Sequence, residues 1–197
     1  MFKKIFRFIW KDDSLLSWIV NVILAFLIVK FLIFPGLGLI FNTQLPVVAV
    51  ISCSMEHNVP GSDPCSLKHV NLDDFWKYKG KWYEDNGITK IEFENYPMKD
   101  GFNKGDIIFL YGSEKIRKGD IIVFKGSSSS GNPIIHRVVK IKENGYQTKG
   151  DNNQDSYPQL NEININPQNT VGKAFLRIPY LGWVKIGFSN LIDMFRR

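Results

Sequence analysis

The 197-residue chain is poor in cysteine and histidine, with two of the first and three of the second. Two cysteines are too few for the disulfide framework of a small secreted domain. Cys53 and Cys65 either pair on an oxidising side of a membrane or stay free thiols that pack as small apolar side chains. His57 and His69 lie near Cys65 without the spacing of metal ligands, so no metal site is expected.

The sequence also lacks an RNP-like or Gly-Lys-rich motif, although its net charge is +6. Much of that excess falls in the first eleven residues, at Lys3, Lys4, Arg7 and Lys11, just before a long apolar run. A membrane protein keeps its cytoplasmic charge in such a position. We therefore expect no nucleic-acid partner and a basic cytoplasmic N-terminus at residues 1–14.

The apolar run covers residues 15–34 and contains a single charged residue, Lys30. As a helix it would be about 30 Å long, enough to cross a hydrocarbon core. It lacks the clear cleavage site of a secretory signal peptide, and a buried core helix is rarely apolar on every face. We predict one transmembrane anchor in a cell membrane, ended by Pro35 and Gly36, with everything after it extracytoplasmic.

Residues 35–185 differ from the anchor in having short β-rich segments separated by turn residues. Predicted strands cover residues 45–52, 106–111, 120–125, 134–142, 146–149 and 171–178. This spacing predicts a mainly β domain, an antiparallel sandwich or partial barrel, with no long helix outside the anchor.

Two segments of this outer region are less regular. Residues 56–103 form a polar, aromatic insertion whose Trp76, Tyr78, Trp82 and Tyr83 rest at a membrane interface or pack over a core edge. Residues 186–197 form a short amphipathic segment, which lies in the interface or on the domain surface.

A serine, a histidine and two aspartates occur in contexts that suit nucleophilic catalysis. Ser54 follows the first predicted strand, where a hydroxyl can stand at the strand tip. His136 interrupts an apolar strand, where a polar ring needs a partner. Asp151 and Asp155 lie in the turn after the next strand, within reach of an imidazole on its neighbour. Such a set supplies a nucleophile, a base and an orienting acid.

The order of four motifs resembles type I signal peptidase. Ser-Met follows an anchor, and then come Gly-Asp-Ile-Ile-Val-Phe, Ile-His-Arg-Val and Lys-Gly-Asp-Asn-Asn. The pattern is similar to the archaeal and endoplasmic-reticulum branch, in which His replaces the lysine base of most bacterial enzymes. The resemblance covers the anchor, residues 45–55 and residues 104–185.

The resemblance implies a role for each of these residues. Ser54 is the nucleophile and His136 the general base. Asp155 matches the usual partner of the histidine and is preferred as the orienting acid, with Asp151 shaping the site. The oxyanion hole would use the backbone N–H of Ser54 and the hydroxyl of Ser52.

The chain departs from the family pattern at two positions near the nucleophile. Cys53 stands where relatives commonly have glycine, so the backbone freedom of glycine is lost there. His57 follows Glu56 where the family often has proline, which makes His57 a second candidate base. The family match and its position in a loop favour His136.

The implied function is removal of signal peptides from secretory pre-proteins after small residues, with no cofactor or metal. The implied partners are signal peptides, the lipid bilayer and the protein translocation machinery. Two other readings remain. Self-cleaving repressor peptidases use a Ser-Lys pair but are soluble, which the anchor argues against. A membrane-tethered, non-catalytic β domain that binds a partner would keep the serine, histidine and aspartate by accident.

Overall fold

The computed structural model describes residues 2–59, 65, 70–126, 132–187 and 194. These residues form two compact units, 1–41 and 42–197, and each is described by itself. Most of the predicted amphipathic segment 186–197 lies outside the described residues.

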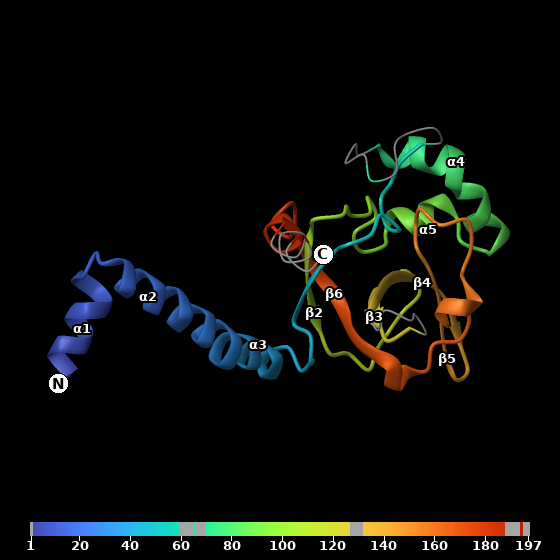
Figure 1. Ribbon diagram of the computed structural model, residues 1–197. Helices are drawn as coiled ribbons and strands as arrows, with labels where there is room; N and C mark the ends of the chain where they lie inside the picture. Colours follow the sequence, from blue (N-terminus) through green and yellow to red (C-terminus); the bar gives the residue numbers. More distant parts are fainter. Residues whose placement is uncertain (1, 60–64, 66–69, 127–131, 188–193, 195–197) are drawn as a thin grey trace. The chain divides into compact units, whose positions relative to one another are not determined.

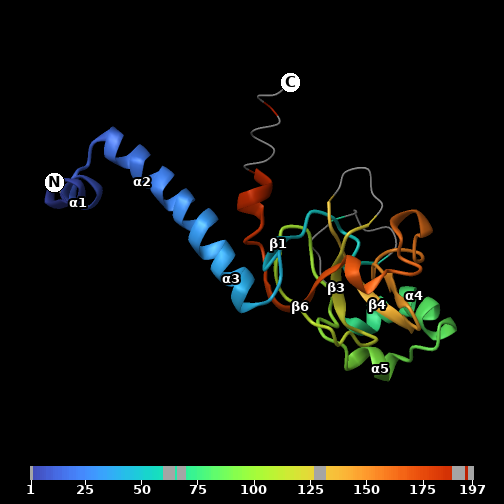
Figure 2. The same cartoon turned by 90° about the horizontal axis from the view of Figure 1, so that it is seen from below.

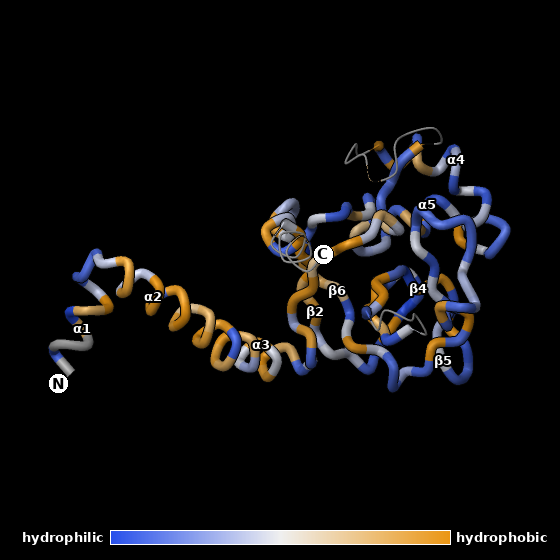
Figure 3. Tube along the Cα trace, in the orientation of Figure 1, coloured by the Kyte–Doolittle hydropathy of each residue, from blue (hydrophilic) through white to orange (hydrophobic). Residues whose placement is uncertain are grey.

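The N-terminal unit is helical. Its elements are α1 (Phe2–Lys11), α2 (Leu15–Ile28), the π-helical η1 (Val29–Ile33) and α3 (Phe34–Ile40). Ser14 begins α2 as its N-cap, since its hydroxyl accepts a hydrogen bond from the N–H of Ser17. From Leu15 to Ile40 the helix is continuous and apolar along most of its length (Figure 3), and it is long enough to cross a membrane.

The predicted end of this helix at Pro35 is wrong, because the helix continues to Ile40. A proline inside a helix lacks an N–H, and its ring presses on the carbonyl four residues earlier. Here the N–H of Phe34 bonds to the carbonyl of Val29, so the turn before Pro35 is wider than an α-helical turn. The wider turn leaves room for the proline ring, and the helix passes through.

The C-terminal unit contains one open antiparallel sheet, in the strand order β1-β2-β6-β3-β4-β5 (Figure 1). The strands are β1 (Val47–Ala49), β2 (Ile107–Tyr111), β3 (Ile121–Phe124), β4 (Ile134–Lys142), β5 (Gly145–Lys149) and β6 (Thr170–Ile178). All six predicted strands are confirmed, and β4 has the predicted bounds. The described strands share one antiparallel sheet that is not closed, in agreement with the predicted mainly β domain.

The main apolar core lies against β1, β2, β3 and β6. In β2, Ile108 and Leu110 are fully buried while their neighbours are less so, which is the alternation of a strand with one face inward. The core consists of Val50, Met55, Phe102, Ile108, Leu110, Ile121, Val123 and Ala174. Met55 directly follows Ser54, so the nucleophile candidate is attached to the core.

The insertion contains a helix of four turns, which the sequence analysis did not expect. Asn71 is the N-cap of α4 (Leu72–Asp85), and α5 (Lys90–Glu94) follows beside it (Figure 2). Of the two places open to the aromatic rings, a core edge is confirmed for Trp76 and Tyr83, while Tyr78 is half exposed. The second apolar cluster contains Phe75, Trp76, Tyr83, Ile88, Phe93 and Val139 of β4.

Candidate active site

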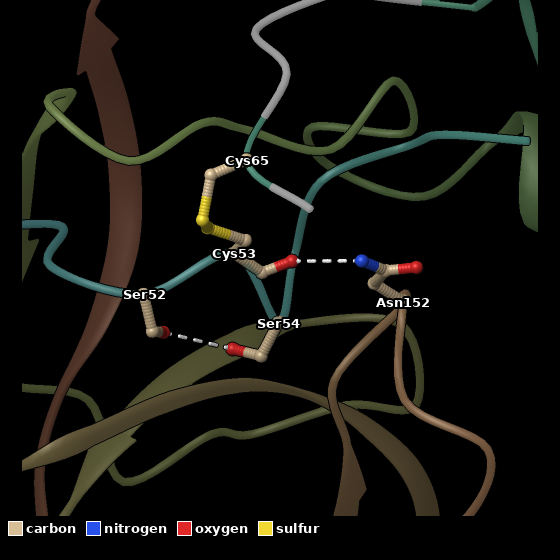
Figure 4. The surroundings of a disulfide bond; sticks show 5 residues. All are labelled: Ser52, Cys53, Ser54, Cys65 and Asn152. Carbon is tan, nitrogen blue, oxygen red and sulfur yellow. Dashed lines mark hydrogen bonds between the residues drawn. A yellow bond between two sulfur atoms is a disulfide. The ribbon is translucent and has the colours of Figure 1, made fainter. Parts of the chain in front are cut away.

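Ser54 lies in a tight loop just after β1, and this loop is held on several sides. The N–H of Phe102 donates to the carbonyl of Met55. The amide of Asn152 donates to the carbonyl of Cys53 at 3.1 Å, and its backbone N–H donates to the carbonyl of Ser54 at 2.8 Å. Cys53 also forms a disulfide bond with Cys65 (Figure 4), so the pairing of the two cysteines is confirmed.

His136 and Ser54 are brought together although 82 positions separate them in the chain. The Nε2 atom of His136 lies 2.8 Å from the Oγ of Ser54. The imidazole is on β4, where His136 is paired with Ile122 of β3, and it is 3% exposed. A strand that is hydrogen-bonded on both sides, to β3 and β5, therefore holds the ring beside the hydroxyl.

The carboxylate behind His136 is that of Glu162. The Nδ1 of His136 is hydrogen-bonded to Oε1 of Glu162. Oε1 also accepts from the hydroxyl of Thr148 at 3.3 Å, and Oε2 accepts from the N–H of Tyr157 at 2.8 Å. Glu162 is fully buried, so three donors satisfy its oxygens in the absence of solvent.

This contact fixes the tautomer of His136. A carboxylate only accepts hydrogen bonds, so Nδ1 carries the proton and donates to Glu162. Nε2 then has a free lone pair directed at the hydroxyl of Ser54. The geometry is that of a general base ready to take the Ser54 proton.

Neither aspartate predicted as the orienting acid occupies this place. Asp155 is exposed and accepts hydrogen bonds from the indole of Trp82 at 3.0 Å and from the N–H of Ser156. Asp151 is buried in a separate polar cluster on the other side of the turn. The expectation that Asp155 contacts His136 is therefore wrong: the residue in contact with His136 Nδ1 is Glu162.

Asp151 is the centre of a buried ionic cluster. Both its oxygens accept from the guanidinium of Arg137, at 2.9 and 2.8 Å, and it also accepts from the Tyr83 hydroxyl and the His57 Nε2. Burial raises the pKa of Asp151, but the charge of Arg137 and the hydrogen bonds from His57 and Arg137 hold it well below its usual range. The His57 ring stacks on the Phe75 ring, with 3.6 Å between the ring centroids. The second candidate base thus belongs to this cluster.

A groove of about 600 Å³ opens beside Ser54 and His136. One wall is the segment from Leu45 to Ser52, and the other is the start of β4 with Ile134 and Ile135. Ser52 is exposed, and its hydroxyl lies 3.2 Å from that of Ser54 (Figure 4), beside the reacting oxygen. The walls are mostly apolar, so the groove suits an uncharged, extended segment.

Glu162 carried little local signal in the sequence. It stands within Asn-Glu-Ile-Asn-Ile-Asn, which reads as a polar connection. Its position depends on pairing with β5: Tyr146 bridges to Ile165, and the N–H of Thr148 donates to the Glu162 carbonyl. The usable clue was that Glu162 is the next acidic residue after Asp155.

Comparisons with known proteins found relatives among the curated proteins. No protein-family model matches the chain. It is 38% identical over 99 residues to the signal peptidase complex catalytic subunit SEC11C of Homo sapiens, covering 45% of this chain and 51% of the relative. The catalytic subunits SEC11 of Candida tropicalis and Eremothecium gossypii are 34% and 37% identical, over 61% of their length.

The chain thus spans between half and three fifths of the length of these curated relatives. Their shared name matches the resemblance read from the four sequence motifs. Over about half of its length, this chain is a homologue of the catalytic subunits of signal peptidase complexes.

Proposed function

We propose that this protein is a membrane-anchored serine endopeptidase that removes signal peptides from secretory pre-proteins. The observation that carries the proposal is the unbroken hydrogen-bonded chain from Ser54 through His136 to Glu162. Nucleophile, base and orienting acid in this order are the requirement for acyl transfer by serine. The homology to signal peptidase catalytic subunits supports the choice of substrate.

In the first half of the reaction, His136 Nε2 takes the hydroxyl proton as Ser54 Oγ attacks the scissile carbonyl carbon. The imidazolium that forms is stabilised by the carboxylate of Glu162. The same proton then passes to the leaving amine, the peptide C–N bond breaks, and an ester links Ser54 to the signal peptide. A water molecule, deprotonated by His136, hydrolyses this ester and restores the serine.

The negative oxygen of the tetrahedral intermediate needs donors beside Ser54. We assign this role to the backbone N–H of Ser54 and the hydroxyl of Ser52. The 3.2 Å between the two serine oxygens supports Ser52, because the oxyanion forms next to Oγ. Each donor of this kind contributes about 10²- to 10³-fold in rate in enzymes where it has been removed.

The substrate segment would add to the sheet along β1. Among the described strands β1 lies at the edge of the sheet and pairs with β2 alone, so we assign its other side to β-augmentation by the substrate. The groove is walled by Ala49, Ile51 and Ile135 near the nucleophile. Shallow apolar walls accept small side chains, in agreement with cleavage after small residues.

The apolar helix Leu15–Ile40 would anchor the enzyme in the membrane that holds its substrates. With the basic residues 1–14 in the cytoplasm, the catalytic domain is extracytoplasmic. A disulfide at Cys53 and Cys65 supports an oxidising compartment. Confinement to one plane raises the effective concentration of enzyme and pre-protein, and the translocation machinery is a further partner.

A Ser-Lys mechanism is the main alternative chemistry, and Lys149 is its candidate base. Burial lowers the pKa of Lys149 to about 8, as a lysine base requires. However, its ammonium donates to the carbonyls of Gly150 and Asp151, whereas Ser54 Oγ has His136 Nε2 at 2.8 Å. The geometry therefore favours the histidine.

The test is cleavage of a pre-protein by the detergent-solubilised full chain, followed by identification of the mature N-terminus. Ser54→Ala and His136→Ala should each abolish cleavage while the circular dichroism spectrum stays unchanged. Full activity in either variant would refute the serine mechanism. A folded wild-type chain that cleaves no pre-protein would instead favour the non-catalytic, partner-binding domain.

A further inference from the structure

The turn that follows β5 holds the backbone of the nucleophile. Asn152 contacts the two peptide groups that flank Ser54. Its side-chain amide donates to the carbonyl of Cys53 (Figure 4), and its backbone N–H donates to the carbonyl of Ser54. The position of Ser54 Oγ relative to His136 therefore depends on where this turn, residues 150–152, is fixed.

The three carbonyls of the same turn all accept hydrogen bonds from lysine. Lys149 Nζ donates to the carbonyls of Gly150 at 3.0 Å and Asp151 at 3.2 Å. Lys79 Nζ donates to the carbonyl of Asn152 at 2.8 Å. Hydrogen bonds from a charged donor are about twice as strong as neutral ones. Two ammonium groups thus hold a turn that makes direct contact with the nucleophile loop.

Both ammonium groups depend on α4. Lys79 is on this helix, and the Nζ of Lys149 lies 5.0 Å from the ring centre of Trp82 and 4.8 Å from that of Tyr83. These two aromatic faces of α4 stabilise the buried cation. Tyr83 also donates to Asp151 at 2.9 Å, so two side chains of this helix, Lys79 and Tyr83, bond directly to the turn.

Burial of these two lysines disfavours the charged form of their amino groups. Lys149 is 1% exposed, and desolvation lowers its pKa, as it lowers that of Lys79, which is itself partly buried. Each ammonium also disfavours the other, since the charge of Lys79 contributes to the low pKa of Lys149. An apolar side chain would remove this unfavourable burial. What the ammonium groups supply is the set of directed hydrogen bonds to the turn.

We propose that α4 is a positioning element for the nucleophile and that Lys79 is a positioning residue, acting on Ser54 through Asn152. The insertion that carries α4 is then part of the catalytic apparatus, although none of its described residues lines the groove beside Ser54. The inference rests on the proposed peptidase function. One part of the inference, that Lys79 restrains the turn, can be measured without any catalytic activity.

The experiment compares Lys79→Met with Lys77→Met in the full-length, solubilised chain. Lys77 is on the same helix but is exposed and packs over Tyr78, so it is the matched control. We expect Lys79→Met to lower kcat for a pre-protein about tenfold, with KM changed less than twofold, because the groove is left intact. Lys79→Arg, which keeps a charged donor, should recover most of the loss.

A second measurement is hydrogen exchange at the backbone N–H of Asn152, which donates to the Ser54 carbonyl. Lys79→Met should accelerate this exchange about tenfold, and Lys77→Met should not. Equal kcat and equal exchange in the two variants would overturn the inference. So would a kcat loss that disappears at a lower temperature where both variants are fully folded, because Lys79 would then serve stability alone. If the wild-type chain cleaves nothing, the proposed function fails, and the exchange experiment still decides whether Lys79 restrains the turn.

Discussion

His136 and Glu162 form a buried hydrogen bond in which the imidazole Nδ1 faces the glutamate Oε1. Glu162 is fully buried and His136 is nearly so. A buried carboxylate stabilises an imidazolium more than an exposed one does, because little solvent screens the charges. In the mechanism that we propose, the acid that orients His136 is therefore this glutamate from the loop beside β5.

We expect Glu162→Gln to lower kcat by about 10³-fold or more, because a neutral amide stabilises neither the required tautomer nor the imidazolium. Glutamine keeps the shape of the side chain and its bonds to Thr148 and Tyr157 remain possible. The measurement is pre-protein cleavage at saturating substrate. Asp155→Asn is the control and should retain activity within about threefold, since Asp155 is exposed and bonded to Trp82. A larger loss of kcat in Asp155→Asn than in Glu162→Gln would assign the role of orienting acid to Asp155.

The strands were predictable because their signal is local. β4 alternates little but is bounded by Pro133 and by Asn144-Gly145, and β-branched residues fill it, so its bounds follow from the sequence. The helix α4 was missed although its start carries a cap. Asn71 precedes two aspartates, and Phe75 and Tyr83 recur at helical spacing, but the many charges between them hid this pattern.

The pairing of Ser54 with His136 was also predictable, whereas the contact of His136 with Glu162 was not. Ser54 and His136 each lie in a recognisable motif on or next to a strand. Glu162 is brought to His136 by a long-range contact, the pairing of its segment with Tyr146 and Thr148 of β5. Asp151 stands in a strong motif, yet it forms its ion pair with Arg137, the residue that follows His136 in the sequence. A motif identifies such residues but does not say which neighbour each one contacts.

Gly150→Ala should reduce activity because glycine allows the turn to approach the catalytic pair. A Cβ at position 150 would lie 2.7 Å from the Ser54 carbonyl oxygen and 2.8 Å from His136 Nε2. Such contacts force the turn, the loop or the imidazole to move, and a displacement of about 1 Å costs about 10²-fold in rate. The check is kcat against that of Gly187→Ala, where a Cβ meets nothing within 4 Å. Equal kcat in both variants would show that the turn yields without disturbing the site.

Reduction of the Cys53–Cys65 disulfide should lower the thermal stability of the C-terminal unit, residues 42–197. The bond closes a loop with a sequence separation of 12 next to the nucleophile, and cross-links of this size contribute about 3 kcal/mol. The measurement is Tm with and without dithiothreitol. The double variant Cys53→Ala, Cys65→Ala should have the Tm of the reduced wild type, with and without dithiothreitol. A wild-type Tm that is the same with and without dithiothreitol would contradict this prediction.

Asp151→Asn should destabilise the fold most at neutral pH and least in acid. The folded-state pKa of Asp151 is held below the ordinary value of 3.8, so its ionised form stabilises the fold above about pH 4. This contribution is lost as the pH falls below 4 towards the folded-state pKa. Leaving Arg137 buried without its partner costs about 3–5 kcal/mol at pH 7. Denaturant unfolding between pH 3 and pH 7 tests this, with the exposed Asp100→Asn as control; a pH-independent difference from wild type would contradict it.

The pKa of Lys149 is lowered for a different reason from that of Asp151, although both shifts make the free energy of unfolding rise with pH. Its folded-state pKa of about 8 lies below the ordinary 10.5, mainly because burial disfavours the ammonium. Between pH 8 and 10.5 the unfolded chain therefore binds more protons than the folded one, and the free energy of unfolding rises with pH. Relative to Lys149→Met, the wild type should gain up to about 3 kcal/mol over this range. Tyrosines titrate in both proteins and cancel in the difference. A flat difference would mean that Trp82, Tyr83 and the turn carbonyls fully offset the burial of the charge.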